Sequence, residues 1–131
     1  MIDLKDGGLY YINFGNTLPG EINKIHLAVV FVIKGVDNVV FVVPLTSPKI
    51  KHFKTEIDFK ERNYLETKFL RLHYIRQTDS IALFEQVKSL SRNRIKDTYK
   101  DADHRPIVLN SKELDILKSK LIKYLKFILY K

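Results

Sequence analysis

The chain has 131 residues, which is enough for one domain with a hydrophobic core and too few for two of ordinary size. Lys and Arg number 23 against 15 Asp and Glu, so the net charge of +8 makes nucleic acid the first partner to consider, although many basic proteins bind none. The absence of cysteine excludes disulfides and thiolate metal sites and fits the cytoplasm, and no run reaches the roughly 18 apolar residues of a membrane span.

The first part of the chain predicts β-strands. Three segments are dense in aromatic and β-branched residues, at 8–14, 26–34 and 38–45. The connection between the last two contains Gly35, which tolerates positive φ, and is short enough for a hairpin turn. We therefore expect 26–34 and 38–45 to pair as an antiparallel hairpin.

Further strands are expected in the middle of the chain. Residues 53–59 alternate apolar and polar side chains, as a half-buried strand does. Residues 68–76 alternate less cleanly and could instead hold a helical turn; a strand is favoured. Residues 80–90 could form a short helix by composition, but the turn-prone residues before them favour a strand, and 91–95 then resemble a single helical turn.

The C-terminal segment predicts one amphipathic helix at about 111–130. Asn110 and Glu113 have the spacing of a capping box, in which each side chain accepts a hydrogen bond from the other residue's backbone N–H. Leucine and isoleucine recur every three or four residues between lysines, a pattern that favours packing on a sheet over binding to a membrane. We expect a mainly β (α+β) fold in one domain, residues 1–131, with strands within about 8–108 and no membrane partner.

The sequence lacks the common catalytic and metal-binding motifs: no Gly-rich phosphate loop, HExxH, CxxC or GxSxG occurs, and no two histidines have metal-ligand spacing. We expect no metal and no cofactor. In the predicted hairpin, His26 would lie opposite Thr46 and next to Ser47. An imidazole and hydroxyls near lysines suit RNA cleavage, in which a base removes the 2′-OH proton and donors stabilise the phosphate. The alternative is that His26 only forms a hydrogen bond at a strand end, while the hydroxyls cap a turn.

Three segments resemble the MazF/PemK family of toxin endoribonucleases. They are "GGLYYINFGNTLPGEINKIHLAVVFVI" at 7–33, "FVVPLTSPK" at 41–49 and "DSIALFEQVKSLSRNRI" at 79–95. The resemblance implies a small SH3-like β barrel of the MazF/PemK/CcdB type with a C-terminal helix, acting as a homodimer. It also implies metal-independent cleavage of single-stranded RNA to 2′,3′-cyclic phosphate and 5′-OH ends, and inhibition by an antitoxin. Toxins neutralised by RNA share the Leu-Thr-Ser-Pro-Lys strand end, so the antitoxin could be protein or RNA.

The resemblance also assigns roles to single residues. Thr46, with Ser47 beside it, falls on the family's phosphate-stabilising Thr; Glu21, Glu85 and Gln86 fall on residues that contact RNA. His26 departs from the family, because it stands where the catalytic Arg is typical. Either His26 serves as acid and base, or the chain only binds RNA; we favour activity. Further RNA contacts are expected from four residues: Lys24, Lys49, Lys51 and His52.

Two other functions fit the same fold. One is a non-catalytic RNA-binding barrel derived from a toxin. The other is a toxin that acts on a protein target, as the gyrase-poisoning relatives do. The presence of both His26 and Thr46 argues against the protein-directed toxin.

Overall fold

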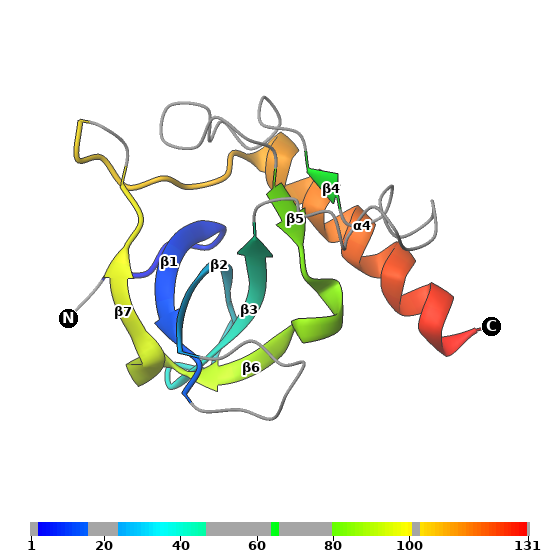
Figure 1. The fold of residues 1–131 in the computed structure, drawn as a ribbon, viewed down its shortest axis with the longest axis horizontal. Coiled ribbons are helices and arrows are strands. Elements are labelled where there is room, and N and C mark those ends of the chain that lie inside the picture. The colour runs from blue at the N-terminus through cyan, green and yellow to red at the C-terminus, as the bar shows by residue number, and fades with distance from the viewer. Residues whose placement is uncertain (1–2, 16–23, 47–63, 66–79, 101–102, 131) are drawn as a thin grey trace.

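The structure is a computed structural model, and it describes residues 3–15, 24–46, 64–65, 80–100 and 103–130. The described elements follow one another along the chain as shown in Figure 1: β1 (Gly8–Asn13), β2 (Ile25–Val32), β3 (Val39–Thr46), β4 (Tyr64–Leu65), β5 (Ser80–Ala82), the 3₁₀ helix η2 (Phe84–Gln86), β6 (Lys88–Ser91), the 3₁₀ helix η3 (Arg92–Arg94), β7 (Ile95–Thr98) and α4 (Ser111–Leu129).

The strands form one antiparallel sheet in the order β4-β5-β3-β2-β1-β7, with β6 also paired to β3. β6 and β7 lie on opposite sides of the three central strands and are joined through η3, so the sheet curls strongly (Figure 1). Among the described strands no ladder joins β6 to β7. The expected mainly β, α+β class with a C-terminal helix is confirmed, and the sheet is not closed into a barrel.

The predicted β2–β3 hairpin is confirmed. Its ladder runs from Ala28 opposite Pro44 to Val32 opposite Val40. The chain reverses where the Val36 N–H donates to the Ile33 carbonyl at 3.1 Å. Gly35 there has φ of 81°, a conformation that costs glycine little because it has no Cβ.

The three central strands are buried on both faces, which explains their nearly continuous apolar sequences. Odd-numbered residues of β1, β2 and β3 build the helix-side core together with Leu117 of α4; they include Leu9, Leu27, Val29, Phe31, Val43 and Leu45. Even-numbered residues build a second core on the other face: Tyr10, Ile12, Phe14, Ala28, Val30, Val40 and Val42. Leu90 of β6 and Ile95 of β7 pack against this second core.

Helix α4 begins with the predicted capping box. The Glu113 N–H donates to Asn110 Oδ1 at 2.8 Å, and the Asn110 N–H donates to Glu113 Oε1 at 2.9 Å. Leu117 is fully buried, and Leu114, Leu121 and Tyr124 pack against the helix-side core.

The C-terminal end of α4 extends past the strands (Figure 1). Four residues of the predicted apolar stripe are exposed: Ile122, Leu125, Ile128 and Leu129. Packing on the sheet is therefore confirmed for Leu114, Leu117 and Leu121 and wrong for these four residues.

The expectation of a single strand over 80–90 is wrong. β5 ends at Ala82, η2 follows, and β6 begins at Lys88. The break is explained by Phe84, which is 1% exposed and lies 5.9 Å from Tyr124 of α4, ring centre to ring centre. The helical turn expected after residue 90 is confirmed as η3. The strands expected at 53–59 and 68–76 lie outside the described residues.

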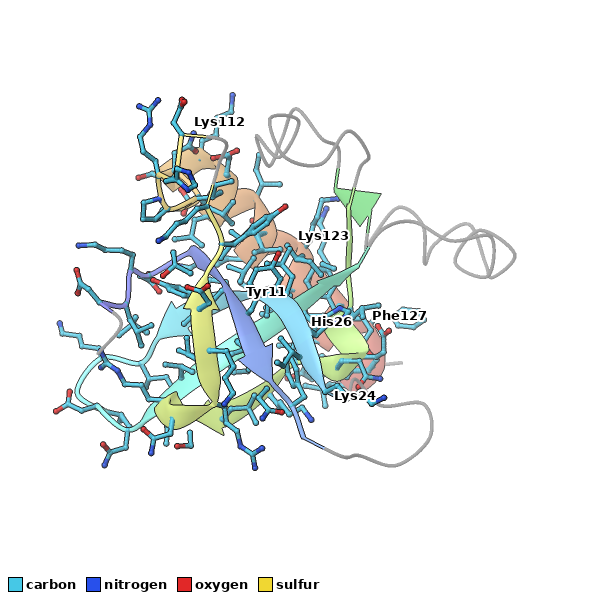
Figure 2. The ribbon with its side chains drawn as sticks, turned by 60° about the vertical axis from the view of Figure 1, so that its left-hand side comes forward. Tyr11, Lys24, His26, Lys112, Lys123 and Phe127 are labelled. Carbon is cyan, nitrogen blue, oxygen red and sulfur yellow. The ribbon has the colours of Figure 1, made fainter. Side chains whose placement is uncertain are left out.

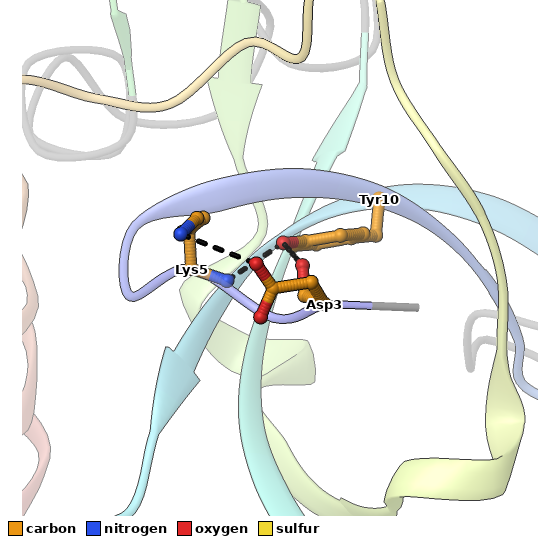
Figure 3. Close-up of polar contacts among 3 residues, drawn as sticks. All are labelled: Asp3, Lys5 and Tyr10. Carbon is orange, nitrogen blue, oxygen red and sulfur yellow. Dashed lines mark hydrogen bonds and ion pairs between the residues drawn. The ribbon is translucent and has the colours of Figure 1, made fainter. Parts of the chain in front are cut away.

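The segment before β1 is held against the sheet by the Tyr10 hydroxyl. This hydroxyl accepts a hydrogen bond from the Lys5 N–H at 2.8 Å and donates to the Asp3 carbonyl at 3.4 Å (Figure 3). The Lys5–Asp3 ion pair, 3.2 Å between Nζ and Oδ2, is exposed, and such pairs contribute little. The buried hydroxyl is the stronger attachment because its partners would otherwise lose a hydrogen bond.

Candidate functional site

The candidate site lies at the end of the β2–β3 hairpin. Continuing the observed register beyond Ala28 and Pro44 brings position 26 opposite position 46, as the sequence predicted. His26 also pairs with Ile12 of β1 and is half-buried. Its Nε2 lies 2.7 Å from the carbonyl oxygen of Leu45, the residue before Thr46.

This contact fixes the proton arrangement of His26. A carbonyl oxygen can only accept a hydrogen bond, so Nε2 must carry the hydrogen and donate it to Leu45. In the neutral ring the lone pair is then on Nδ1. The ring is also held by Phe14, whose centre lies 6.5 Å from that of His26 with the planes at 70°, an edge-to-face arrangement. Nδ1 is therefore the nitrogen that can accept a proton.

The end of β3 also holds the segment that carries Glu85 and Gln86. Ala82 of β5 pairs with Leu45, and the Leu83 N–H donates to the Pro44 carbonyl at 2.9 Å. η2 follows directly, with Glu85 exposed and Gln86 half-buried. Leu45 thus contacts His26 on one side and pairs with the strand leading to Glu85 and Gln86 on the other.

Lys24 lies just before β2, at the end of the sheet where β1 ends and β2 begins. The Phe14 N–H donates to the Lys24 carbonyl, and the Lys24 N–H donates to the Gly15 carbonyl, each at 2.7 Å. Lys24 has φ of 55°, which is uncommon for a residue with a Cβ, and its side chain is exposed. Figure 2 shows Lys24 and His26 at the same end of the sheet.

The sequence analysis did not single out Lys88, which belongs to the same surroundings. Its Nζ lies 5.5 Å from the centre of the Phe14 ring, the ring that also contacts His26. The signal that could have revealed it is the alternation of β6, in which Ser89 and Ser91 are exposed while Lys88 shares the half-buried row with Leu90. A lysine on the inward row of a strand is unusual.

Several predicted site residues cannot be compared with the structure. For Thr46 the structure describes the backbone: it is the last residue of β3 and pairs with Ile81 of β5. Five others lie outside the described residues: Glu21, Ser47, Lys49, Lys51 and His52. Within the described ranges, no group of three or more His, Asp or Glu side chains could hold a metal ion.

The comparisons with known proteins identify the family. The sequence model of the family described as PemK-like, MazF-like toxin of type II toxin-antitoxin system matches residues 5–125. The match extends from before β1 into α4 and includes His26, the end of β3 and η2. This chain belongs to the PemK/MazF toxin family, and a cognate antitoxin is accordingly its expected partner. A comparison with curated protein sequences finds no match.

Helix α4 is not a membrane span. In the part of the chain that the structure describes, no helix combines the length and the apolar character needed to cross a bilayer.

Proposed function

We propose that this chain is a toxin that cleaves single-stranded RNA without a metal ion, the activity typical of its family. The observation that carries the proposal is the geometry around Leu45: its carbonyl fixes the His26 ring, and its backbone pairs with the strand that leads to Glu85 and Gln86. The proposed proton acceptor, His26, and the two groups proposed to contact RNA bases, Glu85 and Gln86, thus come from segments far apart in the sequence.

In the proposed reaction, Nδ1 of His26 accepts the proton of an RNA 2′-OH. The 2′-oxygen then attacks the adjacent phosphorus, the bond from phosphorus to the 5′-oxygen breaks, and that oxygen takes up a proton from water, while His26 returns its own proton to the solvent. The products are a 2′,3′-cyclic phosphate and a 5′-OH. The hydroxyls of Thr46 and Ser47 donate to the phosphate oxygens as negative charge develops.

RNA binding is proposed to use charge for affinity and η2 for base choice. Lysines supply contacts to phosphates that do not depend on sequence, whereas amide and carboxylate groups can read base edges. Lys24, Lys49, Lys51 and His52 serve the first role, and Glu21, Glu85 and Gln86 the second. Because the proposed substrate is cellular RNA, the proposed location is the cytoplasm.

We further propose a homodimer, supported by the apolar end of α4. Ile122 is 51% exposed and Leu129 is 67% exposed, and the two lie on one side of the helix with Leu125 between them. A second copy of the chain would cover this surface, whose exposure is otherwise unfavourable.

One observation favours a second function, RNA binding without cleavage. The Nε2–H of His26 is already used by the Leu45 carbonyl, which is what a purely structural histidine at a strand end would do. The two functions differ in whether Nδ1 takes part in proton transfer.

The experiment that separates them compares His26→Asn with wild type on a long unstructured RNA in EDTA, with the fragment ends mapped. Asparagine keeps an amide donor for Leu45 but has no nitrogen that accepts a proton. His104→Asn is the matched control, because His104 is exposed and its φ of 61° suits asparagine. Discrete cuts with 5′-OH ends from wild type and His104→Asn, lost in His26→Asn, support the enzyme. Intact RNA that remains bound to wild type overturns cleavage and leaves the binding function.

A further inference from the structure

Lys88 has surroundings unlike those of an ordinary surface lysine. It pairs with Val42 of β3, whose side chain belongs to the second core, and it shares the inward row of β6 with Leu90. Its ammonium lies 5.5 Å from the centre of the Phe14 ring, which is itself only 5% exposed. Among the described residues no carboxylate pairs with this ammonium.

Lys88 and His26 approach the same aromatic ring. His26 pairs with Ile12 and Lys88 pairs with Val42, and both partners belong to the second core. His26 and Lys88 therefore lie on the same face of the sheet. Phe14 contacts the imidazole edge-to-face and the ammonium through its π face. The Lys88 ammonium and the imidazole of the proposed base therefore contact the same aromatic ring.

The site needs such a cation. Nε2–H of His26 donates to Leu45, so the neutral imidazole has no second N–H to offer a phosphate. The attack of the 2′-oxygen spreads negative charge over the phosphate oxygens, and a fixed cation nearby stabilises that charge. Lysine is suited to this because its ammonium is a compact charge on a stem that can rotate toward a ligand.

We propose that Lys88 binds an RNA phosphate next to the bond that is cleaved, and that Phe14 keeps its ammonium in place between substrates. The proposal rests on the proposed function, because it assigns a phosphate-binding residue to the same site. Lys88 would then set both affinity for the RNA backbone and the rate of the chemical step, whereas Gln86 would act on base choice.

The test uses Lys88→Met, which keeps an apolar stem against Phe14 and removes the charge, and Lys88→Arg, which keeps the charge. Lys96→Met is the matched control, since Lys96 is an exposed lysine on β7. Affinity for an RNA with 2′-fluoro groups in place of its 2′-hydroxyls is measured at several salt concentrations, and cleavage is measured with unmodified RNA in single turnovers. Melting temperatures identify variants that fail to fold. If Lys88→Met does not fold, Lys88→Gln is used in its place.

Lys88→Met is expected to reduce the slope of log affinity against log salt by about 0.7, the loss of one single-strand phosphate contact. Its single-turnover rate at saturating RNA is expected to fall about 100-fold, and Lys88→Arg is expected to recover most of that loss. If Lys88→Met matches Lys96→Met in both slope and rate while wild type cleaves, the role of Lys88 is overturned and the proposed function stands. If wild type binds RNA without cutting it, the enzyme is overturned. The slope of log affinity against log salt then decides alone whether Lys88 binds a phosphate. If wild type neither binds nor cuts, both proposals are overturned.

Discussion

The imidazole of His26 donates from Nε2 to the carbonyl oxygen of Leu45 across 2.7 Å. The contact joins two residues on paired strands, so the β2–β3 hairpin holds the ring in a fixed orientation. It also decides which nitrogen can take a proton, because Nε2 carries the hydrogen that is donated to Leu45 and Nδ1 carries the lone pair of the neutral ring. A base with a fixed orientation is what proton abstraction from a positioned hydroxyl requires.

Replacing His26 by arginine separates proton transfer from charge. His26→Arg introduces the residue that is typical of the family at this position, so it is expected to bind RNA at least as tightly as wild type. Because a guanidinium cannot accept a proton, any cleavage it retains should differ from wild type in its dependence on pH. Single-turnover rates measured across a range of pH check this. An arginine variant with both the wild-type rate and the wild-type pH profile would mean that position 26 acts only through its charge.

Removing the Tyr10 hydroxyl is expected to destabilise the fold. In Tyr10→Phe the Lys5 N–H loses its hydrogen-bond acceptor in a partly buried place, at a cost of about 1 kcal/mol in the free energy of unfolding. Urea denaturation measures the change. Tyr11→Phe is the control, since Tyr11 is more exposed and its hydroxyl has no hydrogen bond within the described residues; an equal loss in both variants would contradict the assigned role of Tyr10.

Breaking the capping box is expected to weaken α4. Asn110→Ala leaves the Glu113 N–H without its side-chain acceptor and should lower the free energy of unfolding by about 1 kcal/mol. Ser111→Ala, at the exposed first residue of the helix, should change it by less than about 0.5 kcal/mol. Thermal unfolding followed by circular dichroism compares the two, and equal stability would show that the cap is unimportant.

A charge on the apolar end of α4 is expected to separate the proposed dimer. Leu125→Lys changes a residue that is 37% exposed, so the folded chain should tolerate it while a second copy should not. Light scattering coupled to size-exclusion chromatography gives the mass in solution. Val36→Lys makes the same change at a comparably exposed position in the β2–β3 turn and should leave the mass unchanged. A wild-type protein with the mass of one chain would end the dimer proposal.

Features set by neighbouring residues could be predicted from the sequence. Gly35 between two apolar runs was sufficient to predict the β2–β3 hairpin, and with it that position 26 lies opposite position 46. The spacing of Asn110 and Glu113 was sufficient to predict where α4 begins. Each of these depends on short-range geometry, which local sequence carries.

Features set by distant contacts could not be predicted. The break between β5 and β6 depends on Phe84 reaching Tyr124, and no local alternation shows such a contact. Periodicity identified the apolar stripe of α4 but not how far the sheet extends beneath it, so the exposure of Leu125 was missed. Lys88 was missed for the same reason, because its ammonium meets the ring of Phe14, a residue far away in the sequence.

The burial of β1, β2 and β3 on both faces limits where this fold can acquire new chemistry. A polar replacement in the middle of these strands would disturb one core or the other, whichever way its side chain points. Strand ends and the 3₁₀ turns escape this limit, as the exposed positions Lys24 and Glu85 illustrate. Such boundary positions are therefore where related chains can diverge in specificity while keeping the same scaffold.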